Sequence, residues 1–430
     1  MERARMELLT NRPRGTEDLL VPTVKRWQRL EETARDLARR YGYDEIRTPI
    51  FEHTELFARS AGDTSDVVSK EMYTFTDRGG RSLTLRPEGT APVVRAFLEN
   101  RLYAGPQPVK LFYLGPMFRY GRPQAGRLRQ FHQFGVEFLG AGDPAADAEV
   151  ICLALEFCRC LGLEGVELRL NSVGCPRCRP LYRQILLEYL APRQQYLCED
   201  CLARYRRNPL RVFDCKESGC REALREAPVI TSYLCPECAD HWQMVKSALG
   251  RLGFSYREDP YLVRGLDYYT RTAFELVAPG IGAQGSIGGG GRYDGLVQAC
   301  GGPPTPAVGL ALGLERVLLA LESQGGIDFG PSEFRVFVAV AEDIDPTEAA
   351  ALVLRLRRAG YTVDQDYLRR SLKAQMKHAG RWGAAVTLIL GPEEQKEGVV
   401  TLRLMATGRQ EKVPLANLEA VLAQYRPAQS

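Results

Sequence analysis

Two segments far apart in the chain carry side chains that could bind a polar ligand inside a fold. Residues 118–138 read FRYGRPQAGRLRQFHQFGVEF, and residues 262–272 read LVRGLDYYTRT. Both place arginines, carboxylates or tyrosines in stretches that otherwise have the apolar character of buried strands. Because an unpaired buried charge is costly, such strands favour a face turned toward a polar ligand. The pattern predicts an active site.

Side chains in a strand alternate between its two faces, so residues 130–138 can be assigned face by face. Phe134, Val136 and Phe138 share one face with His132, while Gln133, Gly135 and Glu137 share the other. We interpret the second face as a pocket floor, and GRPQAGR before it as a hairpin loop that keeps Arg119 near the pocket. An edge strand with solvated polar residues is the alternative.

Eight of the twelve cysteines lie between residues 175 and 238. A C-x2-C hairpin offers two thiolates to one tetrahedral ion, and the spacing of the first two pairs suits a zinc ribbon. We expect structural Zn²⁺ here, with no assignment of which cysteines share an ion; the alternative is a thiol-rich helical insertion that binds nothing. The candidate ligands are Cys175, Cys178, Cys198, Cys201, Cys215, Cys220, Cys235 and Cys238.

The elements around these residues predict an α+β fold. An amphipathic helix is expected over residues 22–41, then a strand interrupted by Pro49, a hairpin turning at Gly79 and Gly80, and a helix from residue 87. Hairpins separated by helices indicate an antiparallel sheet with helices on one face.

The cysteine-rich segment, residues 174–250, interrupts this sheet and is interpreted as an inserted domain. The following glycine run, GSIGGGGRYDGLV, is expected to form a turn. PAVGLALGLERVLLALESQG is then expected to be one long helix, with Arg316 off its apolar stripe.

From residue 333 to 430 strands and helices alternate, which predicts a small α/β domain joined through Gly325, Gly326 and Pro331. Its second helix carries basic residues that could face RNA, although the pattern alone favours a solvated basic helix. The whole chain, with 430 residues, suits two or three domains.

Composition excludes some classes of protein. No apolar run reaches the ~20 residues of a membrane span, and the first residues lack the apolar core of a signal peptide, so we expect a cytoplasmic protein without a membrane partner. A net charge of +4, from 57 basic and 53 acidic residues, permits a polyanionic partner without requiring one.

Several ordered motifs make the chain resemble bacterial histidyl-tRNA synthetases, which are class II aminoacyl-tRNA synthetases. They are RPRGTEDLLVP, LRPEGTAPVVRA, FRYGRPQAGRLRQFHQFGVE, LVRGLDYYTRT, GGRYDGLV and PAVGLALGLERV. The resemblance implies a catalytic domain in two parts (residues 1–173 and 251–326), the cysteine-rich insertion (174–250) and a C-terminal anticodon-binding domain (333–430). It also implies a six-stranded antiparallel catalytic sheet and a homodimer formed partly through the Pro49 region.

The resemblance implies two reactions. L-Histidine and ATP, with Mg²⁺, give histidyl-adenylate and pyrophosphate, and the histidyl group then moves to the 3′ end of histidine tRNA. Attack of a carboxylate on an anionic phosphate needs positive charge and positioning more than acid or base groups. The matching residues are Arg119, Arg264 and Arg316 for catalysis, Arg127 with Arg119 and Arg316 for ATP, and Glu88, Thr90, Gln133, Glu137, Tyr268, Tyr269 and Tyr293 for histidine.

One position departs from the class pattern. Class II enzymes usually have Phe-Arg-x-Glu in this block, whereas Gly121 stands in the fourth place here. We expect adenine to be held by backbone groups and stacking, and Gly121→Glu to lower the KM for ATP. A non-catalytic regulatory paralogue of ATP phosphoribosyltransferase is the main rival, and a zinc-dependent nucleic-acid-binding module is a weaker one.

Overall fold

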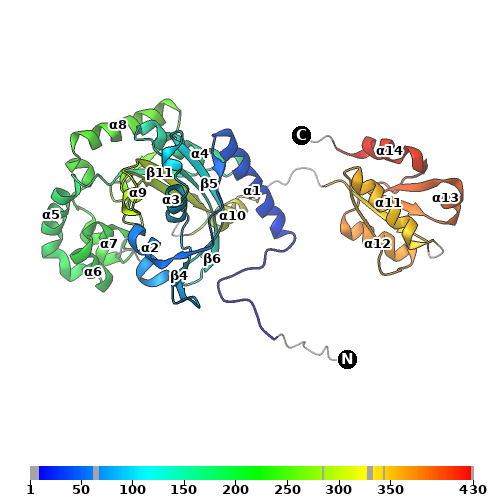
Figure 1. Cartoon of the computed structure of the whole chain (residues 1–430), viewed down its shortest axis with the longest axis horizontal. Coiled ribbons are helices and arrows are strands. Elements are labelled where there is room, and N and C mark those ends of the chain that lie inside the picture. Colours follow the sequence, from blue (N-terminus) through cyan, green and yellow to red (C-terminus); the bar gives the residue numbers. More distant parts are fainter. Residues whose placement is uncertain (1–8, 62–66, 283–284, 327–332, 342–343, 428–430) are drawn as a thin grey trace. The chain divides into compact units, whose positions relative to one another are not determined.

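The computed structural model describes residues 9–61, 67–282, 285–326, 333–341 and 344–427. The chain divides into two compact units, residues 1–327 and 328–430, and Figure 1 shows both. Pro331, a predicted linker residue, lies outside the described part of the chain.

The first unit is built on an eight-stranded sheet of order β1-β5-β6-β11-β10-β9-β7-β8. Its six central strands pair antiparallel throughout, and a two-residue strand adds in parallel at each edge. The predicted antiparallel α+β architecture is therefore confirmed. In sheet order the strands are β1 (Asp44–Glu45), β5 (Val109–Phe118), β6 (Gln130–Leu139), β11 (Ala307–Gly313), β10 (Ser286–Arg292), β9 (Thr270–Val277), β7 (Glu167–Ser172) and β8 (Arg257–Glu258).

Helices cover both faces of this sheet, which differs from the expectation of one helical face. The apolar face of β6 that carries Phe134 and Val136 lies in a core shared with α1 (Thr23–Arg40), α4 (Pro144–Cys160), α8 (Pro236–Arg251) and α10 (Leu314–Ser323). Tyr113 and Met117 of β5 point the other way and pack with α3 (Thr90–Glu99) and α9 (Leu296–Ala299). Alternation along β5 separates the two cores.

Two sequence expectations after residue 285 are wrong. The glycine run forms strand β10 instead of a turn, because β10 and β11 approach so closely that a Cβ on Gly290 would collide with the Gly309 carbonyl oxygen. The expected helix over 306–325 is strand β11 followed by α10. A continuous apolar run fits a buried strand as well as a buried helix, so periodicity could not separate them.

A small three-stranded sheet of order β2-β4-β3 precedes α3. The expected hairpin is present as β3 and β4, while the segment around Pro49 splits into β1 of the large sheet and β2 of the small one. The elements are β2 (Phe51–His53), α2 (Thr54–Ala61), the π-helical turn η1 (Val67–Glu71), β3 (Tyr73–Thr76), β4 (Ser82–Leu85) and the 3-10 turn η2 (Leu102–Ala104).

The cysteine-rich insertion has a core of its own, which includes Tyr182, Leu186 and Val212. Its last helix, α8, instead packs through Trp242 and Val245 into the core of the large sheet. Figure 1 shows the insertion as a group of green helices from which α8 returns to α4. Its other elements are α5 (Arg179–Leu190), η3 (Ala191–Tyr196), α6 (Glu199–Arg207), η4 (Pro209–Asp214), α7 (Ser218–Leu224) and η5 (Ile230–Tyr233).

The C-terminal unit is a five-stranded sheet of order β13-β12-β14-β15-β16. The expected alternation of strands and helices is confirmed through β14, and the antiparallel hairpin β15–β16 was not foreseen. The elements are β12 (Arg335–Val340), α11 (Pro346–Arg358), β13 (Thr362–Gln365), α12 (Leu372–Trp382), β14 (Val386–Leu390), α13 (Pro392–Glu397), β15 (Val399–Leu404), β16 (Gln410–Pro414), η6 (Leu415–Asn417) and α14 (Leu418–Tyr425).

Candidate functional site

A cavity of about 540 Å³ opens on the face of the large sheet that carries Gln133. Residues from the segments 118–138 and 262–272 both reach it, although more than a hundred residues separate the two segments. Nearly all the predicted site residues border the cavity: Glu88, Thr90, Arg119, Arg127, Gln133, Arg264, Tyr268, Tyr269, Tyr293 and Arg316. A single ligand of moderate size can contact all of these groups.

Glu88 closes the cavity at the start of α3. Its carboxylate accepts hydrogen bonds from the backbone N–H groups of Thr90 (2.6 Å) and Ala91 (2.9 Å). These N–H groups have no partner within the helix, so a carboxylate here satisfies them. Burial nevertheless raises the pKa of Glu88, since burial outweighs the hydrogen bonds. A cationic amino group would stabilise the ionised carboxylate.

Glu137 lies fully buried behind the cavity wall and does not itself border the cavity. The Thr90 hydroxyl donates to one carboxylate oxygen (2.7 Å), and the Tyr293 hydroxyl donates to the other. Gly309 makes the space, because a Cβ at that position would collide with the Glu137 carboxylate. Burial raises the pKa of Glu137 to about 8. Glu137 therefore fixes the hydroxyl groups of two residues that border the cavity.

Arginines line the same cavity. The Arg119 Nε donates to the Pro87 carbonyl (2.8 Å), and its guanidinium lies 5.3 Å from the centre of the Phe131 ring. Arg264 lies 3.4 Å from Glu275. Burial lowers the pKa of Arg119 and of Arg316, and neighbouring Arg127 lowers that of Arg316 further. Like charges gathered in one cavity suit a polyanionic ligand.

Buried polar atoms at the cavity without a hydrogen-bond partner among the described residues include the side-chain oxygen of Gln133 and the Nε of Arg264. Buried polar atoms in native proteins are almost always paired, so each indicates where a ligand or a water binds. One is an acceptor from β6 and the other a donor from the 262–272 segment, which suits a ligand carrying both polarities.

Three tyrosines form an aromatic wall. The Tyr268 ring lies 4.7 Å from the Tyr269 ring and 5.7 Å from the Tyr293 ring, measured between centres. Edge contacts of this kind hold rings rigidly and leave hydroxyl groups for recognition. The wall can enclose a flat ring whose edge carries polar atoms.

The sequence also matches models of known protein families. The family model described as histidyl-tRNA synthetase matches residues 15–317. The chain belongs to the histidyl-tRNA synthetase family. A model described as an anticodon binding domain matches residues 335–425, the α/β unit of this synthetase. No helix in the described part of the chain has the length and apolarity to span a membrane.

Relatives match this synthetase over nearly its whole length. It is 62% identical to histidine–tRNA ligase of Moorella thermoacetica, over 95% of this chain and 97% of that protein. It is 60% identical to the ligase of Pelotomaculum thermopropionicum, over 95% and 96% respectively. The structure of apo S. aureus histidyl-tRNA synthetase superposes with a TM-score of 0.82 at 41% identity, covering 96% of this chain and 100% of that one.

One residue of the synthetase site was missed from the sequence. Glu71, at the end of η1, borders the cavity, and its carboxylate would lie 3.6 Å from a Cβ built on Gly121. The Tyr120 N–H also donates to the Glu71 carbonyl (2.8 Å). The structure thus supplies a carboxylate beside Gly121, where the class pattern has a glutamate and this sequence does not. No local pattern could have indicated it, because 50 positions separate the two residues in the chain.

The eight cysteines between residues 175 and 238 form two separate groups of four. Cys175 and Cys178 join Cys235 and Cys238, whereas Cys198 and Cys201 join Cys215 and Cys220. The sequence left open which cysteines share an ion. In the structure the first two C-x2-C pairs, whose spacing suits a zinc ribbon, belong to different groups. Spacing along the chain could not reveal this, because the chain from 179 to 234 folds on itself before Cys235 returns to Cys178.

Proposed function

We propose that the cavity performs both reactions of the family, namely formation of histidyl-adenylate from ATP and L-histidine and transfer of the histidyl group to histidine tRNA. The observation that carries the proposal is that carboxylates, tyrosines and arginines line one cavity. The carboxylates and tyrosines can bind the amino group and ring of an amino acid, and the arginines can bind the phosphates of a nucleotide triphosphate.

For the first reaction, the arginines position the phosphates and stabilise charge. We assign Arg119 to the α-phosphate, Arg264 to the α-phosphate and the substrate carboxylate, and Arg316 to the terminal phosphates. The substrate carboxylate attacks phosphorus as pyrophosphate leaves, so no protein base is required. Charged donors held beforehand in a buried site are worth about 10²–10³ in rate each.

For histidine recognition, we assign Glu88 to the substrate amino group, with Thr90 and Gln133 beside it. Tyr269 and the Glu137–Tyr293 pair then read the imidazole, which carries one donor and one acceptor nitrogen. A site built to hydrogen-bond both nitrogens rejects analogues without them by ~10⁴–10⁵, which makes editing unnecessary.

ATP enters as its magnesium complex. Mg²⁺ prefers phosphate oxygens together with one or two carboxylates, and it neutralises charge on the leaving pyrophosphate. Glu275 offers such a carboxylate beside Arg264, and it borders a neighbouring cavity together with Arg127 and Arg316. We assign adenine recognition to Glu71, next to Gly121, which replaces our expectation of backbone groups and stacking alone.

Two further partners, the tRNA anticodon and a second copy of the chain, are assigned to the α/β unit and to the small three-stranded sheet. We propose that the α/β unit binds the anticodon of histidine tRNA in the cytoplasm, and that the chain acts as a homodimer. Ile50, Phe51 and Phe75 support the dimer, since they expose 44%, 51% and 44% of their surface around the small sheet. Exposed apolar groups gathered in this way are typical of interfaces.

Histidine-dependent exchange of labelled pyrophosphate into ATP tests the function. The full chain should catalyse it, and Arg264→Ala should lower kcat/KM by about 10²–10³. Arg257→Ala is the matched control, because that arginine is 66% exposed on edge strand β8. Absence of exchange by the wild-type chain would favour the regulatory paralogue. The ATP phosphoribosyltransferase regulatory subunit/histidyl-tRNA synthetase of Bacillus halodurans shares the fold of this chain, at a TM-score of 0.61 and 22% identity.

A further inference from the structure

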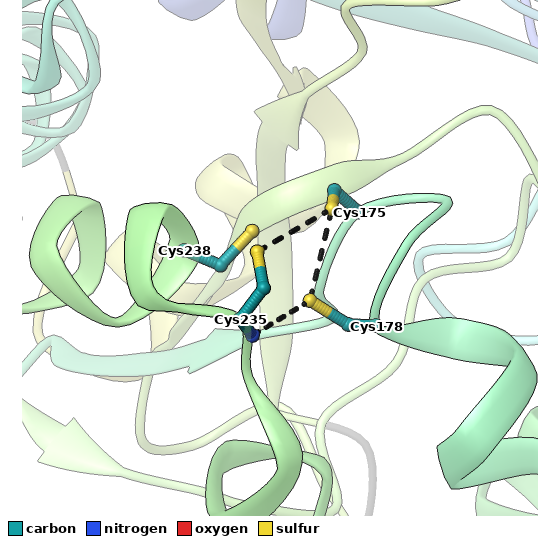
Figure 2. Close-up of side chains that lie close together, drawn as sticks. All are labelled: Cys175, Cys178, Cys235 and Cys238. Atoms are coloured by element: carbon teal, nitrogen blue, oxygen red, sulfur yellow. Dashed lines mark hydrogen bonds between the residues drawn. The ribbon is translucent and has the colours of Figure 1, made fainter.

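Each group of four cysteines has the geometry of a tetrahedral metal site. In the first group the Cys175 sulfur lies 3.7 Å from that of Cys178 and 3.9 Å from that of Cys235, as Figure 2 shows. In the second, the Cys198 and Cys215 sulfurs are 3.8 Å apart. Within each group all four sulfurs lie within 4.8 Å of one another. A zinc ion with Zn–S bonds of about 2.3 Å places its thiolates about 3.8 Å apart.

These distances exclude disulfides, which require sulfur atoms about 2.05 Å apart. All eight cysteines are free. Backbone hydrogen bonds also stabilise negative charge on two of the sulfurs. The Cys235 N–H donates to the Cys178 sulfur (3.1 Å), and the Cys198 N–H donates to the Cys220 sulfur (3.2 Å). Hydrogen bonds of this kind to ligand sulfurs orient them and stabilise a tetrathiolate, whose net charge with Zn²⁺ is −2.

The backbone turn before Cys175 has a conformation and a close contact that favour glycine at position 174. Gly174 has φ +64°, a conformation that favours glycine, and a Cβ there would lie 2.9 Å from the Cys178 Cβ. Cys235 and Cys238 enter from the first turn of α8, so the group closes the insertion at its base. Arg177 and Glu237, one from each hairpin, form an ion pair beside it.

The first group is connected to Tyr269, which is assigned to histidine recognition. Arg179, which follows Cys178, donates through its guanidinium to the backbone carbonyl of Tyr269, and through Nε to the carbonyl of Val173 (3.3 Å). The Arg271 N–H donates to the carbonyl of Gly174 (2.9 Å). The position of Tyr269 therefore depends on the turn that holds Cys175 and Cys178.

The second group is connected to Arg264, at the other end of the segment that runs from Arg264 to Tyr269. Arg211 donates to the backbone carbonyl of Arg264 (2.6 Å) and forms a 3.0 Å ion pair with Asp214, the neighbour of Cys215. Asn208 donates to the side chain of Asp267 (3.1 Å). The position of Arg264 therefore depends on the 208–215 segment, which Cys198, Cys201 and Cys220 fasten to the rest of the insertion.

We infer that the chain binds two structural zinc ions, one in each cysteine group, and that together they hold the segment from Arg264 to Tyr269 at both ends. The metals lie outside the cavity and take no part in the chemistry. Arg179 and Arg211 are positioning residues. Each hydrogen-bonds the backbone of a segment that binds substrate, so the position of that segment depends on the two metal sites. This second half of the inference rests on the proposed function, whereas the zinc content does not.

Metal analysis of the purified, reduced full chain tests the zinc content directly. We expect two zinc ions per chain, one in Cys235→Ser, one in Cys220→Ser, and two in the control Cys160→Ser, whose cysteine belongs to neither group. Less than one zinc in wild-type protein, or iron in place of zinc, would overturn the assignment. If the variants do not fold, titration of the wild-type chain with a mercurial in the presence of a zinc indicator should release two zinc ions as eight thiols react.

Steady-state pyrophosphate exchange tests the positioning. Arg179→Gln should raise the KM for histidine about tenfold at unchanged zinc content and unchanged KM for ATP, while Arg211→Gln should lower kcat by a similar factor. Arg183→Gln and Arg207→Gln are matched controls, because Arg183 is exposed on the same helix as Arg179 and Arg207 is exposed on the helix before Arg211. Normal kinetic constants in both test variants would refute the positioning. Absence of exchange in the wild-type chain would instead refute the proposed function and leave the zinc result standing.

Discussion

Replacing Glu137 by glutamine should change how the stability of the catalytic unit depends on pH. The Glu137 side chain is fully buried, and burial raises its pKa to about 8. In the unfolded chain the same carboxyl ionises near pH 4.3. Between these two values the folded protein retains a proton that the unfolded protein releases. The wild-type chain therefore loses stability as pH rises through this window, relative to a variant with no ionisable group at the position.

The size of the effect follows from linkage. Each pH unit inside the window changes the free energy of unfolding by about 1.4 kcal/mol per proton. From pH 5 to pH 7 the wild-type chain should lose roughly 3 kcal/mol relative to Glu137→Gln. The stabilising effect of the protonated carboxyl is complete below pH 4.3 and is lost by pH 8, above which the two curves should run parallel. Differences in hydrogen bonding of the amide to Thr90 and Tyr293 shift the whole curve without changing its slope.

Urea unfolding at pH 5, 6, 7 and 8, followed by tryptophan fluorescence, measures this difference. Trp27 and Trp242 both lie in the core of the large sheet, so they report on the catalytic unit. Glu164→Gln is the control, because that glutamate is exposed at the surface, and it should follow the wild-type curve. A wild-type-minus-variant difference that changes by less than about 1 kcal/mol from pH 5 to 7 would refute the reasoning.

Three further predictions concern other parts of the site and its support. Asp147→Asn leaves Arg292 fully buried without its main counter-ion and should destabilise the chain by about 3–5 kcal/mol in urea unfolding, whereas Asp294→Asn, 30% exposed, should cost under about 1 kcal/mol. Glu71→Gln should raise the KM for ATP about tenfold and leave the KM for histidine unchanged in pyrophosphate exchange; equal effects on both would remove Glu71 from adenine recognition. Tyr293→Phe removes a donor to a buried carboxylate and should raise the KM for histidine at least tenfold; an unchanged value would show that this hydroxyl is not needed.

Local rules predicted the elements that a short stretch of chain specifies. Alternation along residues 130–138 separated Gln133 and Glu137 from Phe134 correctly, since adjacent side chains of a strand must point to opposite faces. The same rules failed at β10 and β11. There glycine-rich, apolar segments form strands because they lie against neighbouring strands. Those neighbouring strands come from other parts of the sequence, so a local pattern does not reveal them.

The sequence by itself determined the kinds of chemistry available: arginines and tyrosines within strands, cysteines in C-x2-C pairs, and the motifs of the synthetase family. Only the tertiary structure decided the partnerships. It placed Thr90 on Glu137, Glu71 beside Gly121, and Cys235 with Cys175 instead of Cys198. Periodicity and spacing act over a few residues, whereas each of these contacts joins residues at least 47 positions apart, which are brought together by the packing of the sheet and its insertion.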